Sequence, residues 1–157
     1  MDYDVKDRII KDLNRRLLVH VREPDIAEHV AARELLKEAL VEFTGKTVLA
    51  YKPYTKQEID IAPLKFDIIS NDIRTAVMTP YDVLIVPMFG YMKDGYRLGR
   101  GGGFYDKLIA NNPTKVSIGV AFSKRLVYFL PEEHDQRVDI LVTDKEIIDL
   151  RKDRLQW

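Results

Sequence analysis

The residues best suited to chemistry in this sequence stand in one glycine-rich segment, Arg97 to Asp106. The segment reads Arg-Leu-Gly-Arg-Gly-Gly-Gly-Phe-Tyr-Asp, and six of the eight glycines of the chain fall between Gly90 and Gly103. Glycine allows backbone N–H groups to turn toward a ligand with no Cβ in the way. Arg97 and Arg100 add permanently charged, forked donors of the kind that bind phosphate. The segment therefore predicts a binding site for a polyphosphate.

The residues on either side of this segment predict where it lies in the fold. Residues 82–87 read Asp-Val-Leu-Ile-Val-Pro, and such a continuous apolar run is typical of a strand buried on both faces of a parallel sheet. Residues 104–110 are predicted to be helical, and a helix that begins just after the loop favours anions at its N-terminus. Lys107 supplies a third cation there.

Two common nucleotide-binding motifs do not describe this segment. No Gly-Lys-Ser/Thr follows the glycines, so the segment is not a Walker A loop. The dinucleotide-binding fingerprint fits poorly because Phe104 occupies its sixth position. The residues alone therefore indicate a phosphate site of no defined class, and an ordinary flexible loop is the alternative.

The rest of the chain alternates predicted helices and strands. Two helices come first, and the second begins with a capping box formed by Asp25 and Glu28. The apolar face expected to be buried in the first helix consists of Val5, Ile9, Ile10, Leu13 and Leu17. The corresponding face of the second helix consists of Ile26, Val30, Leu35, Leu36, Ala39 and Leu40.

Strands are predicted at residues 47–51, 66–69, 82–87, 116–121 and 138–142, the last of them as the final strand, with a short helix near the C-terminus. This alternation predicts an α/β fold, with an open, mostly parallel sheet flanked by helices, in a single domain over residues 1–157. Ligands of such sheets bind beyond the carboxyl ends of the strands, where the glycine-rich segment falls.

Composition narrows the class of partner. Lys+Arg and Asp+Glu both number 25, so no net charge draws the chain toward nucleic acid or an anionic membrane. The chain contains no cysteine, which excludes disulfides and thiolate chemistry. No apolar run approaches the ~20 residues of a membrane span, and the acidic N-terminus lacks a signal-peptide stretch. We therefore expect a cytoplasmic protein with neither a nucleic-acid nor a membrane partner.

The run from Lys93 to Lys107, together with the predicted strand before it, resembles the signature of 5-formyltetrahydrofolate cyclo-ligases. The family pattern there is Gly-Tyr-Arg-Leu-Gly-Arg-Gly-x-Gly-Tyr-Tyr-Asp-Arg. Further similarity to the family lies at residues 118–122, 130–131, 133–135 and 138–139, and upstream at residues 58–60.

The resemblance implies an activity and a set of site residues. Such enzymes use ATP and Mg²⁺ to close 5-formyltetrahydrofolate into 5,10-methenyltetrahydrofolate, releasing ADP and phosphate. The implied ATP-binding residues are Arg8, Arg97, Leu98, Gly99, Arg100, Gly101, Gly102, Gly103, Phe104 and Tyr105. The implied folate-binding residues are Glu58, Gly101, Gly102, Gly103, Phe104 and Tyr105. Arg100 and Tyr105 are the implied catalytic residues, and Asp106 and Asp135 the implied Mg²⁺ ligands.

Each assignment has a plainer alternative. Asp106 could only stabilise the first turn of a helix, and Asp135 could be an ordinary turn residue. Glu58 could be a solvated loop charge, and Tyr105 could pack in the core with a satisfied hydroxyl. His134 is expected only to brace its turn.

The chain departs from the family pattern in two places. The family's first helix carries Lys-x-x-Leu-Arg, and the register that puts Arg8 on that arginine puts Asp4 on the lysine. Lys6 and Lys11 are the two candidate substitutes, and the sequence does not choose between them.

The second departure is the middle of the chain, which is too short for a helix and a strand that wall the pterin in longer relatives. Tyr51, Tyr54 and Phe89 are the aromatic residues expected to compensate. The folate pocket is expected to be weaker or to be completed by a neighbouring subunit, so the protein is expected to be a monomer or a homodimer. Alternatives to the enzyme are a non-catalytic nucleotide- or folate-binding homologue and an ATP-using enzyme with another small substrate.

Overall fold

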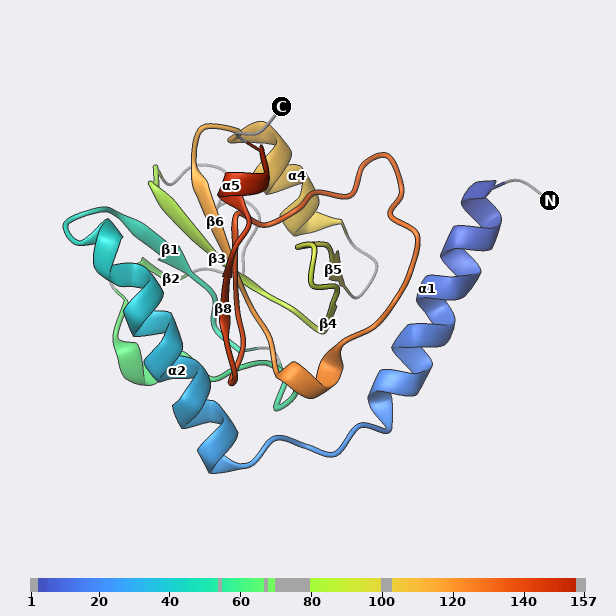
Figure 1. Cartoon of the computed structure of the whole chain (residues 1–157), viewed down its shortest axis with the longest axis horizontal. Coiled ribbons are helices and arrows are strands. Elements are labelled where there is room, and N and C mark those ends of the chain that lie inside the picture. The colour runs from blue at the N-terminus through green and yellow to red at the C-terminus, as the bar shows by residue number, and fades with distance from the viewer. Residues whose placement is uncertain (1–2, 54, 67, 70–79, 100–102, 155–157) are drawn as a thin grey trace.

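The computed structural model describes residues 3–53, 55–66, 68–69, 80–99 and 103–154, and is built around one twisted sheet of six strands (Figure 1). The order across this sheet is β2-β1-β3-β6-β7-β8. Its strands are β1 (Val48–Ala50), β2 (Ile68–Ile69), β3 (Val83–Pro87), β6 (Val116–Val120), β7 (Ile140–Val142) and β8 (Ile147–Asp149). The helices are α1 (Tyr3–Val19), α2 (Ile26–Leu40), α4 (Phe104–Asn111) and α5 (Arg151–Arg154). Short 3₁₀ turns lie at Val41–Phe43, Ala62–Leu64 and Ser123–Arg125.

The centre of the sheet is the parallel pair β3 and β6, aligned from Val83 opposite Val116 to Pro87 opposite Val120. All five residues of β3 are buried, as its continuous apolar sequence predicts. The side chains alternate between two packed layers, with Val83 and Ile85 facing α2 and Leu84 and Val86 facing α4. The predicted open, mostly parallel α/β sheet with flanking helices is confirmed.

The sheet contains one strand more than predicted. β8 follows β7 and pairs antiparallel with it, Val142 opposite Ile147 and Ile140 opposite Asp149. The prediction that residues 138–142 form the final strand was therefore wrong. The reason is the length of β8, three residues with no alternating pattern long enough to separate a strand from a turn. The predicted short C-terminal helix is present as α5.

Helix α2 forms as predicted but buries a different part of its apolar face. The Asp25 side chain accepts from the amide of Glu28 while the Glu28 side chain accepts from the amide of Asp25, so the capping box is confirmed. Leu36 and Ala39 are buried against the sheet, while Ile26 is 82% exposed. The N-terminal end of the helix extends past the ends of the strands (Figure 1).

Helix α1 turns the opposite face toward the protein from the one predicted. Val5, Ile9, Leu13 and Leu17 are 44–68% exposed, and Ile10 is only partly buried. The inward face instead carries Asp7, Lys11 and Leu18. Apolar periodicity predicted the wrong face because the inward face of this helix lines a polar cavity, and polar residues ordinarily indicate solvent.

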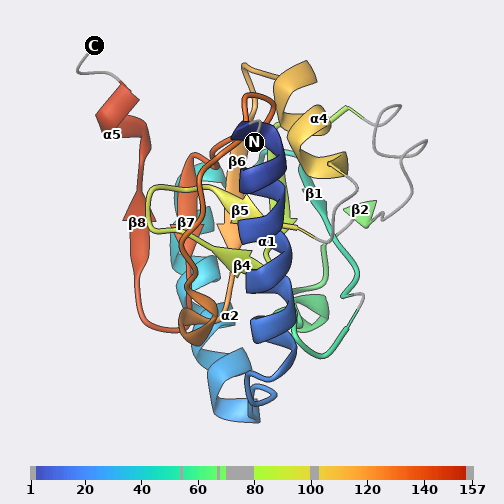
Figure 2. The ribbon, with the colours of Figure 1, turned by 90° about the vertical axis from the view of Figure 1, so that its right-hand side faces the viewer.

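A second, two-stranded sheet stands under α1 (Figure 2). Its strands, β4 (Gly90–Tyr91) and β5 (Arg97–Leu98), form an antiparallel hairpin that the sequence did not predict because each strand has only two residues. Gly95 makes the turn at φ 101°, a backbone conformation that favours glycine. Leu18 of α1 packs in one cluster with Leu98 of this hairpin and with Phe129. The hairpin delivers Arg97 to the carboxyl end of β3.

None of the helices in the described ranges is both long and apolar enough to cross a membrane.

Candidate functional site

A cavity of about 520 Å³ opens between α1, the end of the hairpin, the start of α4 and the loop of residues 132–136. Within the described part of the chain, its cationic side chains are Arg8, Lys11, Arg15, Arg97 and Lys107. Its carboxylates there are Asp106, Glu132 and Asp135. The excess of cations makes the cavity suited to a ligand with several negative charges, such as a polyphosphate.

The inward face of α1 supplies three of these cations. Arg8, Lys11 and Arg15 are separated by three and four residues, which places them along one side of a helix. The Arg15 Nε donates to the carbonyl oxygen of Gly99 over 2.7 Å, so α1 contacts the glycine-rich segment directly. Lys11 is buried in the cavity wall, whereas Lys6 is exposed and does not line it. Between the two lysines that the sequence left open, the structure therefore places Lys11 in the site.

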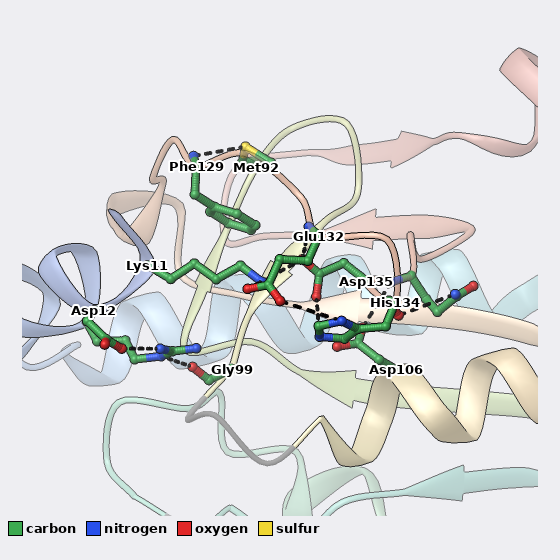
Figure 3. Close-up of polar contacts among 11 residues, drawn as sticks. Lys11, Asp12, Met92, Gly99, Asp106, Phe129, Glu132, His134 and Asp135 are labelled. Atoms are coloured by element: carbon green, nitrogen blue, oxygen red, sulfur yellow. Dashed lines mark hydrogen bonds and ion pairs between the residues drawn. The ribbon is translucent and has the colours of Figure 1, made fainter. Parts of the chain in front are cut away.

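Three groups able to bind a metal ion meet at the far side of the cavity (Figure 3). One ligand atom each of Asp106, His134 and Asp135 lies within 4.8 Å of the others. Asp106 stands in the first turn of α4, and its Oδ1 accepts from the amide of Gln136 over 3.0 Å. The two aspartates implied as Mg²⁺ ligands, which are distant in sequence, therefore come together in the fold. Two carboxylates are the hard oxygen donors that Mg²⁺ prefers, so these residues fit such an ion.

Two further features describe the charge at this cluster. Burial raises the pKa of Asp106, while the Gln136 amide and Arg97 oppose that shift and Asp135 adds to it. The Lys11 Nζ lies 2.6 Å from the Asp135 Oδ2 and 3.1 Å from the Glu132 Oε1. An ammonium group thus supplies positive charge beside carboxylates that would otherwise repel each other.

Arg97 and Tyr105 form a stacked pair at the carboxyl end of β3. The Arg97 Nε donates to the carbonyl of Pro87 over 3.2 Å, and its guanidinium carbon lies 5.1 Å from the centre of the Tyr105 ring. A Cβ on Gly99 would lie 2.8 Å from the Arg97 Nη1, so a side chain at this position would displace the Arg97 guanidinium. Burial raises the pKa of Tyr105 to about 12, with Arg97 opposing and Glu58 adding to the shift. Tyr105 is therefore a hydrogen-bond donor at neutral pH and not a base.

Glu58 does not line the cavity. It is only 8% exposed, and its Oε1 accepts from the amide of Thr55 over 3.2 Å. Its charge raises the pKa of both Tyr51 and Tyr105, and the Tyr51 hydroxyl donates to the carbonyl of the next residue, Ile59. The predicted site thus has two parts, a cationic cavity and a buried carboxylate, with Arg97 and Tyr105 near both.

The remaining predicted residues are distributed as follows. Leu98, Gly99 and Gly103 line the cavity, and the Phe104 ring packs on that of Tyr105 at 4.8 Å. Arg100, Gly101 and Gly102 lie outside the described residues, as does Tyr54. The roles proposed for all of them stay predictions.

The two described aromatic residues expected to wall a pterin do not do so. Tyr51 is 2% exposed with its hydroxyl bonded to the carbonyl of Ile59, and Phe89 is 7% exposed beneath the Arg125 guanidinium. Neither ring offers a free face, so that prediction was wrong. A position directly after a strand indicates nearness to the site but not which way a ring turns.

The sequence alone did not predict Arg15, Glu132 and His134 as cavity residues. For Arg15 a signal was present. Lys11 and Arg15 are four residues apart, the same separation as the lysine and arginine of the family's first-helix motif. Glu132 lies in a loop whose path no local pattern predicts.

Comparison with known proteins identifies relatives of this chain. The sequence model of the 5-formyltetrahydrofolate cyclo-ligase family matches residues 67–144. A 5-formyltetrahydrofolate cyclo-ligase of Mycoplasma pneumoniae is 24% identical over 143 residues, which are 89% of this chain and 87% of that protein. A cyclo-ligase of Escherichia coli K12 is 30% identical over 121 residues, 74% of this chain and 66% of that protein.

Solved structures share the fold. A 5,10-methenyltetrahydrofolate synthetase from Aquifex aeolicus superposes with a TM-score of 0.67 at 24% identity, covering 90% of this chain and 93% of that one. The corresponding protein from Mycoplasma pneumoniae gives a TM-score of 0.58 at 19% identity, covering 92% of this chain and all of that one. The family's sequence model matches this chain, and relatives that share its fold align along most of its length. The chain therefore belongs to the 5-formyltetrahydrofolate cyclo-ligase family.

Proposed function

We propose that this protein catalyses the ATP-dependent cyclisation of 5-formyltetrahydrofolate to 5,10-methenyltetrahydrofolate, with release of ADP and phosphate. The observation that carries the proposal is the cationic cavity that the run from Lys93 to Lys107, the signature segment, forms with the inward face of α1. It is supported by the buried Glu58 carboxylate, which does not line the cavity and whose charge acts on both Arg97 and Tyr105.

The cavity is the proposed site of the triphosphate. Lys11, Arg15 and Arg97 offer charged donors from two different elements, and Lys107 adds a cation from α4. The backbone of residues 98–103, with the Arg100 side chain, completes the proposed contacts by resemblance to the family. Such a cradle stabilises the charge that spreads over the transferred phosphoryl group.

The folate is proposed to bind on the Glu58 side, with its formyl oxygen directed toward the terminal phosphate. That oxygen attacks the γ-phosphorus and ADP leaves; N10 then attacks the activated carbon, loses its proton and displaces phosphate. Tyr105 is suited to donate a hydrogen bond in this sequence because its raised pKa keeps it protonated. Positioning both substrates across the Arg97–Tyr105 pair is the main contribution of the protein.

Asp106 and Asp135 would hold Mg²⁺, and His134 lies near enough to contact the ion or its water. The bound ion would neutralise part of the charge of the phosphates.

The direct test is turnover of 5-formyltetrahydrofolate, followed by the absorbance of the methenyl product in the presence of ATP, with and without Mg²⁺. We expect product to form only when ATP and Mg²⁺ are both present. Binding of ATP without turnover of the folate would contradict the proposal and favour a non-catalytic nucleotide-binding homologue.

Asp106→Asn is expected to change stability and metal binding in opposite directions. Its amide keeps the oxygen that accepts from Gln136 but removes a buried negative charge close to Asp135. The raised pKa of Asp106 means that its ionised form costs stability at neutral pH. We therefore expect the metal-free variant to unfold at a midpoint about 1–4 °C higher than the metal-free wild type.

With Mg²⁺ present, the same variant should lose the metal-dependent rise in midpoint and about 100-fold or more in turnover. Thermal unfolding with and without Mg²⁺ measures the first effect. Glu133→Gln is the control, because Glu133 is an exposed carboxylate of the same loop outside the cavity lining. An Asp106→Asn protein with an unchanged Mg²⁺ response would exclude Asp106 from the metal site.

A further inference from the structure

Three side chains hold the backbone directly after Glu58. His29 Nδ1 accepts from the Asp60 amide over 3.1 Å, and Arg33 Nη1 donates to the Asp60 carbonyl over 2.9 Å. The Tyr51 hydroxyl donates to the Ile59 carbonyl over 2.6 Å. The backbone N–H and the backbone C=O of Asp60 are thus both bound by side chains of helix α2. This helix contains no residue of the signature segment.

His29 is itself held in one orientation. Its ring meets the Phe122 ring edge-on at 5.0 Å, and Phe122 follows β6 at the carboxyl end of the sheet. Because Nδ1 accepts a hydrogen bond, the ring is neutral with its proton on Nε2. Burial lowers the pKa of His29, in keeping with that form. Arg33 stands four residues later, so both side chains project from the same face of α2.

The held residues fix the direction in which Glu58 leaves the backbone. The side chains of Ile59 and Ile61 are 0% and 1% exposed, and they anchor the segment in the core beneath α2. Glu58 precedes them; its carboxylate accepts from the Thr55 amide over 3.2 Å, and its charge raises the pKa of both Tyr51 and Tyr105. A shift of the backbone at Asp60 would therefore move the Glu58 carboxylate relative to Tyr105. The cationic cavity is built from other elements and would be unaffected.

We propose that His29 and Arg33 are positioning residues, which hold the Glu58 carboxylate in place for the folate through their hydrogen bonds to the backbone N–H and C=O of Asp60. This inference rests on the proposed function, because it assigns the Glu58 side of the site to the folate. It separates the two substrates in a testable way: α2 governs the folate half of the site, and α1 with the signature segment governs the nucleotide half.

The test is steady-state kinetics on His29→Leu and His29→Asn. Leucine removes the acceptor, and the loss of this partly buried hydrogen bond should raise KM for 5-formyltetrahydrofolate about 10-fold and leave KM for ATP within about twofold. Asparagine places an acceptor oxygen close to the position of Nδ1, so His29→Asn should recover most of the folate affinity. Arg33→Leu should act like His29→Leu, and Lys37→Leu is the matched control, since Lys37 is an exposed cation one turn further along α2 and bonds only to Glu34 among the contacts described.

Each outcome decides. Equal effects on both KM values, with a lower unfolding midpoint and no rescue by asparagine, would show that His29 serves the fold alone and would overturn the proposal. Unchanged KM for the folate in folded His29→Leu would overturn it as well. If the wild type does not turn over the folate, the proposed function is refuted instead. The positioning role is then tested by direct titration of 5-formyltetrahydrofolate onto the wild type and the variants. Absence of folate binding by the wild type would overturn the positioning role too.

Discussion

Arg97→Met is expected to lower the turnover of the enzyme at limiting ATP by about 10²–10³-fold, the usual effect of losing a charged donor at a phosphoryl-transfer site. Arg97 lines the cationic cavity, donates to the carbonyl of Pro87 and stacks on Tyr105. Methionine keeps the length of the side chain and removes its charge. Calorimetric titration of ATP, together with kcat/KM for ATP, measures the effect.

Two further variants make this test specific. Arg97→Lys keeps the charge without the fork and should recover only part of the lost activity. Arg137→Met removes an arginine whose Nε also donates to a backbone carbonyl, that of Asp94 over 2.7 Å, but which does not line the cavity. It should behave like the wild type. Unchanged ATP affinity in folded Arg97→Met would refute the assignment of this cavity to the nucleotide.

Arg125→Ala is expected to lower the free energy of unfolding by about 3–5 kcal/mol, the range for emptying a large buried site and leaving carbonyls unpaired. Arg125 is 1% exposed. Its Nε donates to the Phe89 carbonyl over 2.6 Å and its Nη1 to the Leu18 carbonyl over 3.2 Å, while the guanidinium lies 4.6 Å from the centre of the Phe89 ring. This one side chain connects the end of α1 to the carboxyl end of β3.

Urea denaturation of the wild type and Arg125→Ala gives the difference directly. Arg16→Ala serves as the control, because Arg16 is exposed on α1 and its removal should cost less than about 0.5 kcal/mol. A similarly small effect of Arg125→Ala would mean that α1 is held by its other contacts.

The sequence was informative where a local pattern had a local cause. Continuous apolar residues predicted the buried strands β3 and β6, and the reciprocal Asp25–Glu28 pair predicted the start of α2. The glycines and arginines of the signature segment predicted a cationic site, which lies at the carboxyl ends of these strands.

The parts that could not be predicted depend on contacts between distant segments. The inward face of α1 is set by the cavity, so Lys11 and Arg15 occupy positions that a periodicity argument assigns to solvent. The meeting of Asp106 with Asp135 joins α4 to a loop and was expected only by resemblance to the family. The contact of His29 with Asp60 has no sequence signature at all.

The way in which α1 is attached has a thermodynamic consequence. Its described contacts with the rest of the protein include the packing of Leu18 and the partly buried Ile10 and the hydrogen bond from Arg125 to the Leu18 carbonyl. Others are polar and involve the cavity cations, Lys11 with Asp135 and Arg15 with Gly99, or the neighbouring Asn14. Docking of the helix and occupancy of the cavity are therefore linked equilibria, and a ligand that binds Lys11 and Arg15 changes the free energy with which α1 closes on the sheet. Amide hydrogen exchange along α1 would report this coupling without any measurement of catalysis.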